Sequence, residues 1–250
     1  MIHFVGAGPG APDLITIRGA KLIQNADVII YAGSLVNQEL LTMAKENCKI
    51  YNSAHMTLEE VIEVMEEAES SFLSTVRLHT GDPSVYGAIK EQIDELEKRG
   101  IACEVCPGVS SFSGAAASLK LEYTLPGVSQ SVIITRIEGR TKVPEAENLK
   151  SLAAHQATMV LFLSSGYAKE VKSQLLEGGY PPDTPAAVVF KATWQEEKIL
   201  RTTLERLPEE MEKAGIEKTA LIIVGNVMGK SYERSKLYDP SFTTGFRKGK

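Results

Sequence analysis

The chain is poor in cysteine, histidine and tryptophan, and it lacks a long apolar run. It holds three cysteines, one tryptophan and four histidines among 250 residues. No apolar run approaches the roughly 18–20 residues of a membrane span, and the opening residues predict a strand rather than a secretory signal. Cys103 and Cys106 have C-x-x-C spacing, but no second cysteine pair or histidine cluster completes a zinc site. We therefore expect no protein-bound metal. We also expect the chain to reside in the reducing cytoplasm, where its three cysteines remain thiols.

A basic arm or stripe is also lacking. The chain carries 27 Lys and Arg against 32 Asp and Glu, for a net charge of −5. This balance argues against nucleic acid as a generic partner. The composition, 43% hydrophobic and 24% charged, is typical of a soluble globular protein.

The first half of the chain alternates short apolar strands with amphipathic helices. This alternation predicts βαβ organisation around a mostly parallel sheet. The predicted strands are residues 2–5, 27–31, 49–52, 74–79 and 102–105. The predicted helices are residues 14–26, 38–46, 57–71, 88–100 and 111–118. Thr57 and Glu60 have the spacing of a capping box at the third helix.

The pattern changes near residues 121–128, which lack a helical stripe and contain Pro-Gly. Beyond this point we expect an α/β region with mixed strand pairing. Its predicted strands are residues 131–136, 159–163, 187–190, 199–203 and 220–224, and its predicted helices are 168–178 and 207–215. The sequence thus predicts an α/β domain over 1–120, a second α/β domain over 121–230, and a polar tail over 231–250 that packs only on a partner.

Three loops rich in glycine and proline follow predicted strands of the first half. They are Gly6–Asp13, Thr80–Gly87 and Pro107–Phe112. Ligands of open α/β sheets bind beyond the carboxyl ends of strands. Glycine permits close backbone approach and proline stiffens a turn. Together the loops predict a rigid, backbone-lined cleft for an uncharged or cationic heterocycle with an amino-acid-like tail.

The first loop also fits the loose dinucleotide pattern G-x-G-x-x-A. Phosphate at such a loop is held by backbone N–H groups, and Pro9 and Pro12 each lack one. The acidic residue needed for a ribose, Asp27, precedes the second apolar strand instead of following it. We therefore discount an NAD-dependent oxidoreductase.

The order and spacing of three motifs resemble the tetrapyrrole methylase family over residues 1 to about 228. The motifs are residues 6–16 (GAGPGAPDLIT), 80–83 (TGDP) and 107–111 (PGVSS). The resemblance implies two α/β domains with a cleft between them that binds S-adenosylmethionine (SAM), and a homodimer. Finer features are similar to the branch that methylates carbon 11 of precorrin-4 or cobalt-precorrin-4 on the way to cobalamin (vitamin B12): residues 31–36, 79–83, 135–141, 162–165 and 190–194.

Site roles follow from the same resemblance. The SAM contacts it implies are Pro9, Gly81, Asp82, Val85, Ser110, Ser111, Leu163 and Ala192. Arg136, Arg140 and Lys191 are the candidates for pairing with substrate carboxylates. Glu138, His79 and Tyr86 are the candidates for a catalytic base or a polar contact to the ring.

Each of these roles has a purely structural alternative. Asp82 could bond its own loop as an Asx turn, and His79 could form a structural hydrogen bond at a strand end. Glu138 could pair with the flanking arginines, and the three basic residues could be solvated surface charges. We expect Trp194 to pack within the second domain.

The function that the resemblance implies is a SAM-dependent C-methyltransferase acting on a tetrapyrrole with several carboxylates. Alternatives are methylation of uroporphyrinogen III, a different precorrin, RNA or a protein histidine. A non-catalytic SAM-binding module is a further alternative. Cobalt, if present, belongs to the substrate, and the sequence does not decide between precorrin-4 and its cobalt form.

Overall fold

A computed structural model describes residues 1–229 and 231–250, and contacts divide the chain into two units. Unit 1 comprises Met1–Ala115 and Lys191–Glu197, and unit 2 comprises Ala116–Phe190 and Lys198–Lys250. Residues 191–197, which we expected within the second half, therefore belong to unit 1. The division into domains at residues 120 and 230 stays a prediction.

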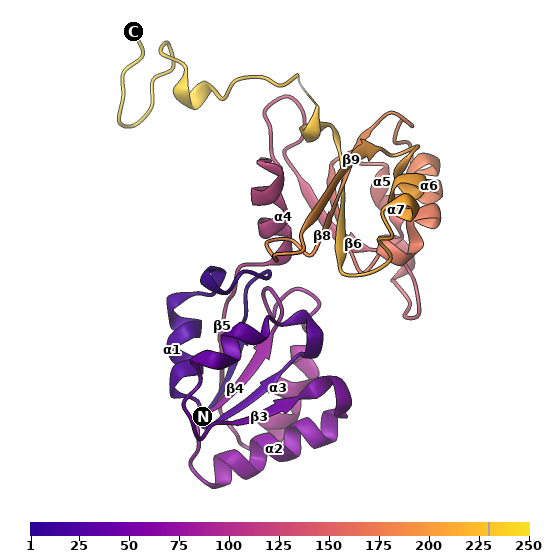
Figure 1. Ribbon diagram of the computed structural model, residues 1–250. Coiled ribbons are helices and arrows are strands. Elements are labelled where there is room, and N and C mark those ends of the chain that lie inside the picture. The colour runs from indigo at the N-terminus through magenta and orange to yellow at the C-terminus, as the bar shows by residue number, and fades with distance from the viewer. Residues whose placement is uncertain (230) are drawn as a thin grey trace. The chain divides into compact units, whose positions relative to one another are not determined.

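Unit 1 is built on a parallel sheet (Figure 1). Its strands are β1 (Ile2–Gly6), β2 (Val28–Tyr31), β3 (Lys49–Asn52), β4 (Thr75–His79) and β5 (Cys103–Cys106), in the order β3-β2-β4-β1-β5. Parallel strands place their carboxyl ends at one edge of a sheet. The three glycine- and proline-rich loops follow β1, β4 and β5, which are direct neighbours. The topology thus brings together the loops that the sequence singled out.

Alternating residues of the buried strands give the sheet two apolar faces. Ile29 of β2 packs in one cluster with Ile23 of α1 (Ile17–Asn25). Its neighbour Ile30 packs in the other cluster, with Met65 of α2 (Leu58–Ser70) and Leu96 of α3 (Ile89–Lys98). Figure 1 shows α1 on one side of this sheet and α2 and α3 on the other. Covering both faces explains the continuous apolar run of β2.

Two predicted helices differ from the observed elements. The helix predicted from residue 14 begins at Ile17, capped by Thr16, because Pro12–Leu14 forms a separate 3₁₀ turn. Residues 38–46 form the 3₁₀ helix Gln38–Met43 rather than an α-helix. The capping box at α2 is confirmed, since the Thr57 hydroxyl accepts from the Glu60 N–H and the Glu60 carboxylate accepts from the Thr57 N–H.

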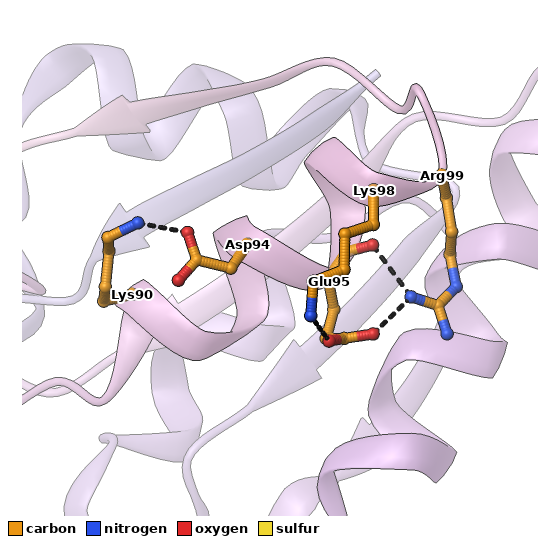
Figure 2. Close-up of polar contacts among 5 residues, drawn as sticks. All are labelled: Lys90, Asp94, Glu95, Lys98 and Arg99. Atoms are coloured by element: carbon orange, nitrogen blue, oxygen red, sulfur yellow. Dashed lines mark hydrogen bonds and ion pairs between the residues drawn. The ribbon is translucent and has the colours of Figure 1, made fainter.

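Ion pairs one helical turn apart line the exposed face of α3 (Figure 2). Lys90 pairs with Asp94, and Glu95 pairs with both Lys98 and Arg99. Pairs at these spacings stabilise a helix by a few tenths of a kcal/mol each at most, ~0.2–0.5 kcal/mol. They therefore supplement the apolar stripe of α3 and do not replace it.

Unit 2 contains a mixed sheet, as the sequence predicted. Its strands are β6 (Val132–Arg136), β7 (Thr158–Phe162), β8 (Pro185–Phe190), β9 (Lys198–Thr203) and β10 (Ala220–Val224), in the order β6-β7-β10-β8-β9. β6 and β7 are parallel, and the remaining pairs are antiparallel. Helices α5 (Leu149–Ala153), α6 (Ala168–Glu177) and α7 (Leu207–Lys213) pack their apolar residues into one core with this sheet. The sequence missed α5 because five residues are too short for a visible helical period.

Residues 231–250 form turns bonded mainly to one another. The Arg247 guanidinium donates to the carbonyl oxygens of Leu237 and Asp239, at 3.0 and 2.5 Å. The segment nevertheless exposes large apolar side chains, including 81% of Tyr238 and all of Phe246. The contacts that residues 231–250 make therefore leave these large apolar side chains exposed to water.

Removing the Thr57 hydroxyl tests the capping box. Thr57→Ala should lower the free energy of unfolding by about 1 kcal/mol, because the Glu60 N–H loses the hydroxyl that caps it. Urea denaturation followed by circular dichroism measures the change. Thr57→Ser keeps the hydroxyl and should retain most of the stability. Equal unfolding midpoints for the alanine variant and the wild type would contradict the assignment.

Candidate functional site

The first two loops of unit 1 are joined directly through their backbones. The Gly8 N–H donates to the Gly81 carbonyl at 3.3 Å, and the Gly81 N–H donates to the Gly8 carbonyl at 2.9 Å. Both glycines have positive φ, +81° for Gly8 and +62° for Gly81. A side chain at either position would strain the backbone, so the pairing depends on glycine.

The third loop meets the other two equally closely. A Cβ added to Gly108 would lie 2.2 Å from the Gly81 carbonyl oxygen, and one added to Gly6 would lie 2.5 Å from the Gly108 Cα. Such contacts are far below van der Waals distance. The three loops therefore meet through their backbone atoms, and the ligand cleft that the sequence predicts there stays a prediction.

Asp82 fastens the second loop to the third. Its Oδ2 accepts from the Gly108 N–H at 2.8 Å, while its Oδ1 accepts from the Ser84 N–H at 2.8 Å and from the Ser84 hydroxyl. Partial burial alone would raise the pKa of Asp82, but these hydrogen bonds outweigh it and hold the pKa below its usual value. Asp82 thus bonds its own loop, as expected for an Asx turn, and it also bonds the third loop through Gly108.

The backbone donors of the first loop are largely used within the protein. The Ala7 N–H donates to the His79 carbonyl at 2.7 Å, and the Ala11 N–H donates to the Thr193 hydroxyl at 3.0 Å. Pro9 and Pro12 have no N–H to offer. A phosphate would therefore find few backbone donors in this loop, and the absence of dinucleotide binding stays a prediction.

Asp27 also argues against a dinucleotide. It lies just before β2, where its carboxylate accepts from Lys45 at 2.5 Å and from the Ser74 N–H at 2.8 Å. It is therefore held at the amino end of the strand, opposite the edge where a ribose would bind.

Residues Lys191–Glu197, here called the clasp, pack on the first loop. The Trp194 indole N–H donates to the Pro9 carbonyl at 3.1 Å. Gly10 lies under the same ring, since a Cβ there would be 2.1 Å from the Trp194 Cδ1. Our expectation that Trp194 packs within the second half was wrong. Periodicity could not reveal this contact, because it joins two irregular segments far apart in the sequence.

Two predicted site residues lie in the clasp. Ala192 is buried, with 6% of its surface exposed. The Lys191 ammonium lies 3.0 Å from the Glu196 carboxylate and 5.2 Å from the centre of the Trp194 ring. Lys191 is thus positioned by an anion and an aromatic face within its own segment.

Ser110 and Ser111 lie where the third loop enters α4 (Ser111–Leu119). Ser110 is buried, and its carbonyl accepts from the N–H groups of Ser113 and Gly114 as the helix begins. In the second loop, the Val85 N–H donates to the Asp82 carbonyl at 3.2 Å. The five predicted SAM contacts Gly81, Asp82, Val85, Ser110 and Ser111 therefore come from loops that touch one another.

His79 is buried at the end of β4, with 4% of its surface exposed, and its ring stacks on Phe4. Burial and the nearby charge of Arg77 lower the pKa of His79 to about 3. Its imidazole is therefore neutral at pH 7 and a weak base. Tyr86, in contrast, is half exposed in the second loop and has a positive φ of 57°.

The remaining predicted site residues belong to unit 2. The Arg136 guanidinium donates to three carbonyl oxygens of its own loop, those of Ile137, Thr141 and Lys142. Glu138 and Arg140 are exposed in that loop. Leu163 directly follows β7, with 66% of its surface exposed and a positive φ of 51°. Arg136 therefore shapes the loop that presents Arg140. Among residues 1–229 and 231–250, no group of three His, Cys, Asp or Glu side chains is placed to hold a metal ion.

The sequence profile of the tetrapyrrole (corrin/porphyrin) methylases matches residues 1–208. The chain is 60% identical to a cobalt-precorrin-4 C(11)-methyltransferase of Methanocaldococcus jannaschii, over 99% of this chain and 96% of that protein. It is 42% identical to a precorrin-4 C(11)-methyltransferase of Mycobacterium tuberculosis, over 95% of each chain.

Solved structures give the same result. The X-ray structure of a cobalamin biosynthetic enzyme, cobalt precorrin-4 methyltransferase, aligns with a TM-score of 0.90 at 46% identity, covering 92% of this chain and 96% of that one. A uroporphyrin-III C-methyltransferase from Thermus thermophilus, complexed with S-adenyl homocysteine, aligns with a TM-score of 0.75 at 27% identity, covering 91% of this chain and 93% of that one.

Replacing the Asp82 carboxylate tests its hydrogen bonds. Asp82→Asn should lower the free energy of unfolding at pH 7 by about 1–2 kcal/mol, because charge-assisted bonds to Ser84 and Gly108 become neutral or are lost. Since the folded-state pKa is lowered, this stabilisation is present above the unfolded value of about 3.9 and disappears as pH falls through the folded value.

Urea denaturation at a series of pH values measures the difference between the two proteins, which should shrink in acid. The exposed Asp183 supplies a matched control, since Asp183→Asn makes the same change of charge. A gap between Asp82→Asn and the wild type that stayed constant down to pH 3 would rule out the carboxylate as its source.

Proposed function

Because the chain belongs to the tetrapyrrole (corrin/porphyrin) methylase family, we propose that it transfers a methyl group from SAM to carbon 11 of precorrin-4 or cobalt-precorrin-4 in cobalamin biosynthesis. The observation that carries this proposal is 60% identity over 99% of the chain to a cobalt-precorrin-4 C(11)-methyltransferase. The three joined loops support it, because they provide a backbone-lined surface without phosphate-binding character.

SAM fits the chemistry of the loops of unit 1. Its heterocycle can be bound by backbone groups, and it carries no phosphate. The glycines at 6, 81 and 108 let the loops pack directly on one another, since a Cβ at Gly6 or Gly108 would collide with the next loop. We assign Pro9, Gly81, Asp82, Val85, Ser110, Ser111, Leu163 and Ala192 to SAM binding, as the family resemblance implies. The bound group supplies an electrophilic methyl on a sulfonium.

Asp82 has a more specific role in this proposal than the sequence suggested. Both of its carboxylate oxygens accept hydrogen bonds from the loops themselves. Asp82 therefore serves mainly to hold the second and third loops together, and the ligand benefits from the fixed shape. Rigid loops reduce the ordering cost of binding.

The substrate carboxylates need basic partners. Arg140 is exposed and is the first of the three candidates, because Arg136 already binds three carbonyl oxygens and Lys191 already faces Glu196. We propose that Arg140 and Lys191 pair with the carboxylates, and that Arg136 orders the loop and contributes charge. An arginine can bind a carboxylate through two parallel hydrogen bonds.

The protein's main contribution to catalysis is positioning. Holding the ring carbon in line with the methyl group converts a bimolecular step into a nearly unimolecular one. If a ring proton must leave, Glu138 and Tyr86 remain the candidates for a base. His79 is a poor one, since its pKa of about 3 leaves it weakly basic.

An anaerobic activity assay tests the function directly. The protein, SAM and precorrin-4 or cobalt-precorrin-4 should give a product one methylene group heavier by mass spectrometry, together with S-adenosylhomocysteine. Parallel reactions with each substrate decide whether cobalt is required, and nuclear magnetic resonance locates the new methyl group.

The same assay separates the alternatives. Turnover of uroporphyrinogen III instead would indicate another methylase of this fold, and SAM binding without turnover of any tetrapyrrole would indicate a binding module. Either result would refute the proposed function.

We also propose a homodimer in the cytoplasm, formed in part by residues 231–250. The segment holds five basic and two acidic side chains, whereas the whole chain carries −5, so its charge complements the rest of a second copy. Its exposed apolar side chains give it surface to bury in a dimer interface.

The cysteines of the chain are free, which suits a reducing compartment. Within the described residues, no helix has the length and apolar character to span a membrane.

The dimer proposal predicts that surface changes in this segment alter the oligomeric state. The double variant Tyr238→Ser, Phe246→Ser should shift the mass measured by light scattering after size exclusion from dimer towards monomer. Phe72, which is 97% exposed in unit 1, provides the control, and Phe72→Ser should leave the mass unchanged. A dimer as stable in the double variant as in the wild type would exclude this segment from the interface.

A further inference from the structure

We propose that Thr193 is a positioning residue for SAM, and that its hydroxyl holds the first glycine-rich loop in the shape that binds the methyl donor. This inference rests on the proposed function, since it concerns the same ligand. Thr193 is not among the residues that we assign to direct contact with SAM. It acts on the loop through its hydrogen bond with the Ala11 N–H.

The backbone of Thr193 is strained. Its φ is +69°, and Lys191, two residues earlier, has a φ of +47°. A positive φ is a genuine outlier for a β-branched residue. Such a conformation costs roughly 1–3 kcal/mol and persists only where the surroundings enforce it. The buried Ala192 lies between these two residues, so the strain is located in the segment assigned to SAM binding.

Hydrogen bonds on both sides enforce the conformation of Thr193. Its N–H donates to the Glu197 carboxylate at 2.6 Å, and its hydroxyl accepts from the Ala11 N–H at 3.0 Å. Its methyl group lies against α4, since a Cβ added to Gly114 would be 3.2 Å from the Thr193 Cγ2. The backbone, hydroxyl and methyl group of Thr193 are thus all engaged.

The hydroxyl of Thr193 completes a set of three side chains that hold consecutive residues of the first loop. The Trp194 indole donates to the Pro9 carbonyl at 3.1 Å, and the Asn37 amide donates to the Gly10 carbonyl at 3.0 Å. Thr193 accepts from the next residue, Ala11. Each peptide unit of the loop tip is therefore fixed by a side chain from outside the loop. A loop fixed in this way loses less freedom when a ligand binds.

Two substitutions separate the hydroxyl from the rest of the side chain. Thr193→Val keeps the shape but removes the acceptor, and Thr193→Ser keeps the acceptor. Thr193→Gly also removes the acceptor, and it relieves the strain, because glycine adopts a φ of +69° without cost. The glycine variant therefore keeps the test valid if valine disturbs folding. Thr219 is an exposed threonine of unit 2 with a φ of +56°, so Thr219→Val and Thr219→Gly are matched controls.

Calorimetry with S-adenosylhomocysteine, steady-state kinetics and tryptophan emission provide the readouts. The loss of one hydrogen bond predicts that Thr193→Val and Thr193→Gly weaken binding about tenfold and raise KM for SAM, with a smaller change in kcat. Trp194 is the only tryptophan, so its emission reports on the clasp itself and should shift in both variants. Thr193→Ser and both Thr219 variants should match the wild type.

Distinct outcomes separate this inference from the proposed function. Wild-type protein that failed to bind S-adenosylhomocysteine would overturn the proposed function and the role of Thr193 together. Wild-type binding that Thr193→Val and Thr193→Gly reproduced would overturn the role of Thr193 alone. Equal loss in Thr193→Ser and Thr193→Val would assign the effect to packing, and would also overturn it.

Discussion

Backbone contact between glycines at the ends of three adjacent strands is the constraint on which the candidate site depends. Gly6, Gly81 and Gly108 approach so closely that a single methyl group at Gly6 or Gly108 would separate the loops. The contact is possible because β4, β1 and β5 are neighbours in a parallel sheet. Asp82 then secures the second loop to the third, and the clasp secures the first. The three loops therefore hold one another in one fixed arrangement.

Much of the fold of each unit could be predicted from the sequence. Strands such as residues 27–31 and 220–224 are short apolar runs bounded by polar or turn residues, and Thr57 with Glu60 marks a helix start by a local mechanism. These signals are contained within a few residues. Two errors in the predicted helices also arise from the local sequence. Pro12 shortens the first helix, and α5 is too short to show a period.

The parts of the candidate site that are sequence motifs could be predicted. The contacts between segments far apart in the sequence could not. The three loops were recognisable by glycine and proline at strand ends. The clasp was not, because residues 9–11 and 191–197 carry no pattern that links them before folding. Arg136 shows the same limit, since its type predicts anion binding, whereas its loop supplies three carbonyl oxygens. The chemical type of a side chain is a sequence property, but whether it is already engaged is a tertiary one.

The clasp has a consequence for the order in which the protein is made. Residues 1–115 leave the ribosome first and contain the whole parallel sheet of unit 1. Residues 191–197 emerge only after most of unit 2 has been synthesised, and domains generally begin to fold as they appear. During that interval the first loop has its glycine partners but not Trp194 or Thr193. The nascent chain therefore carries all five strands of the sheet together with a first loop that lacks these two contacts, and the loop gains them only late in translation.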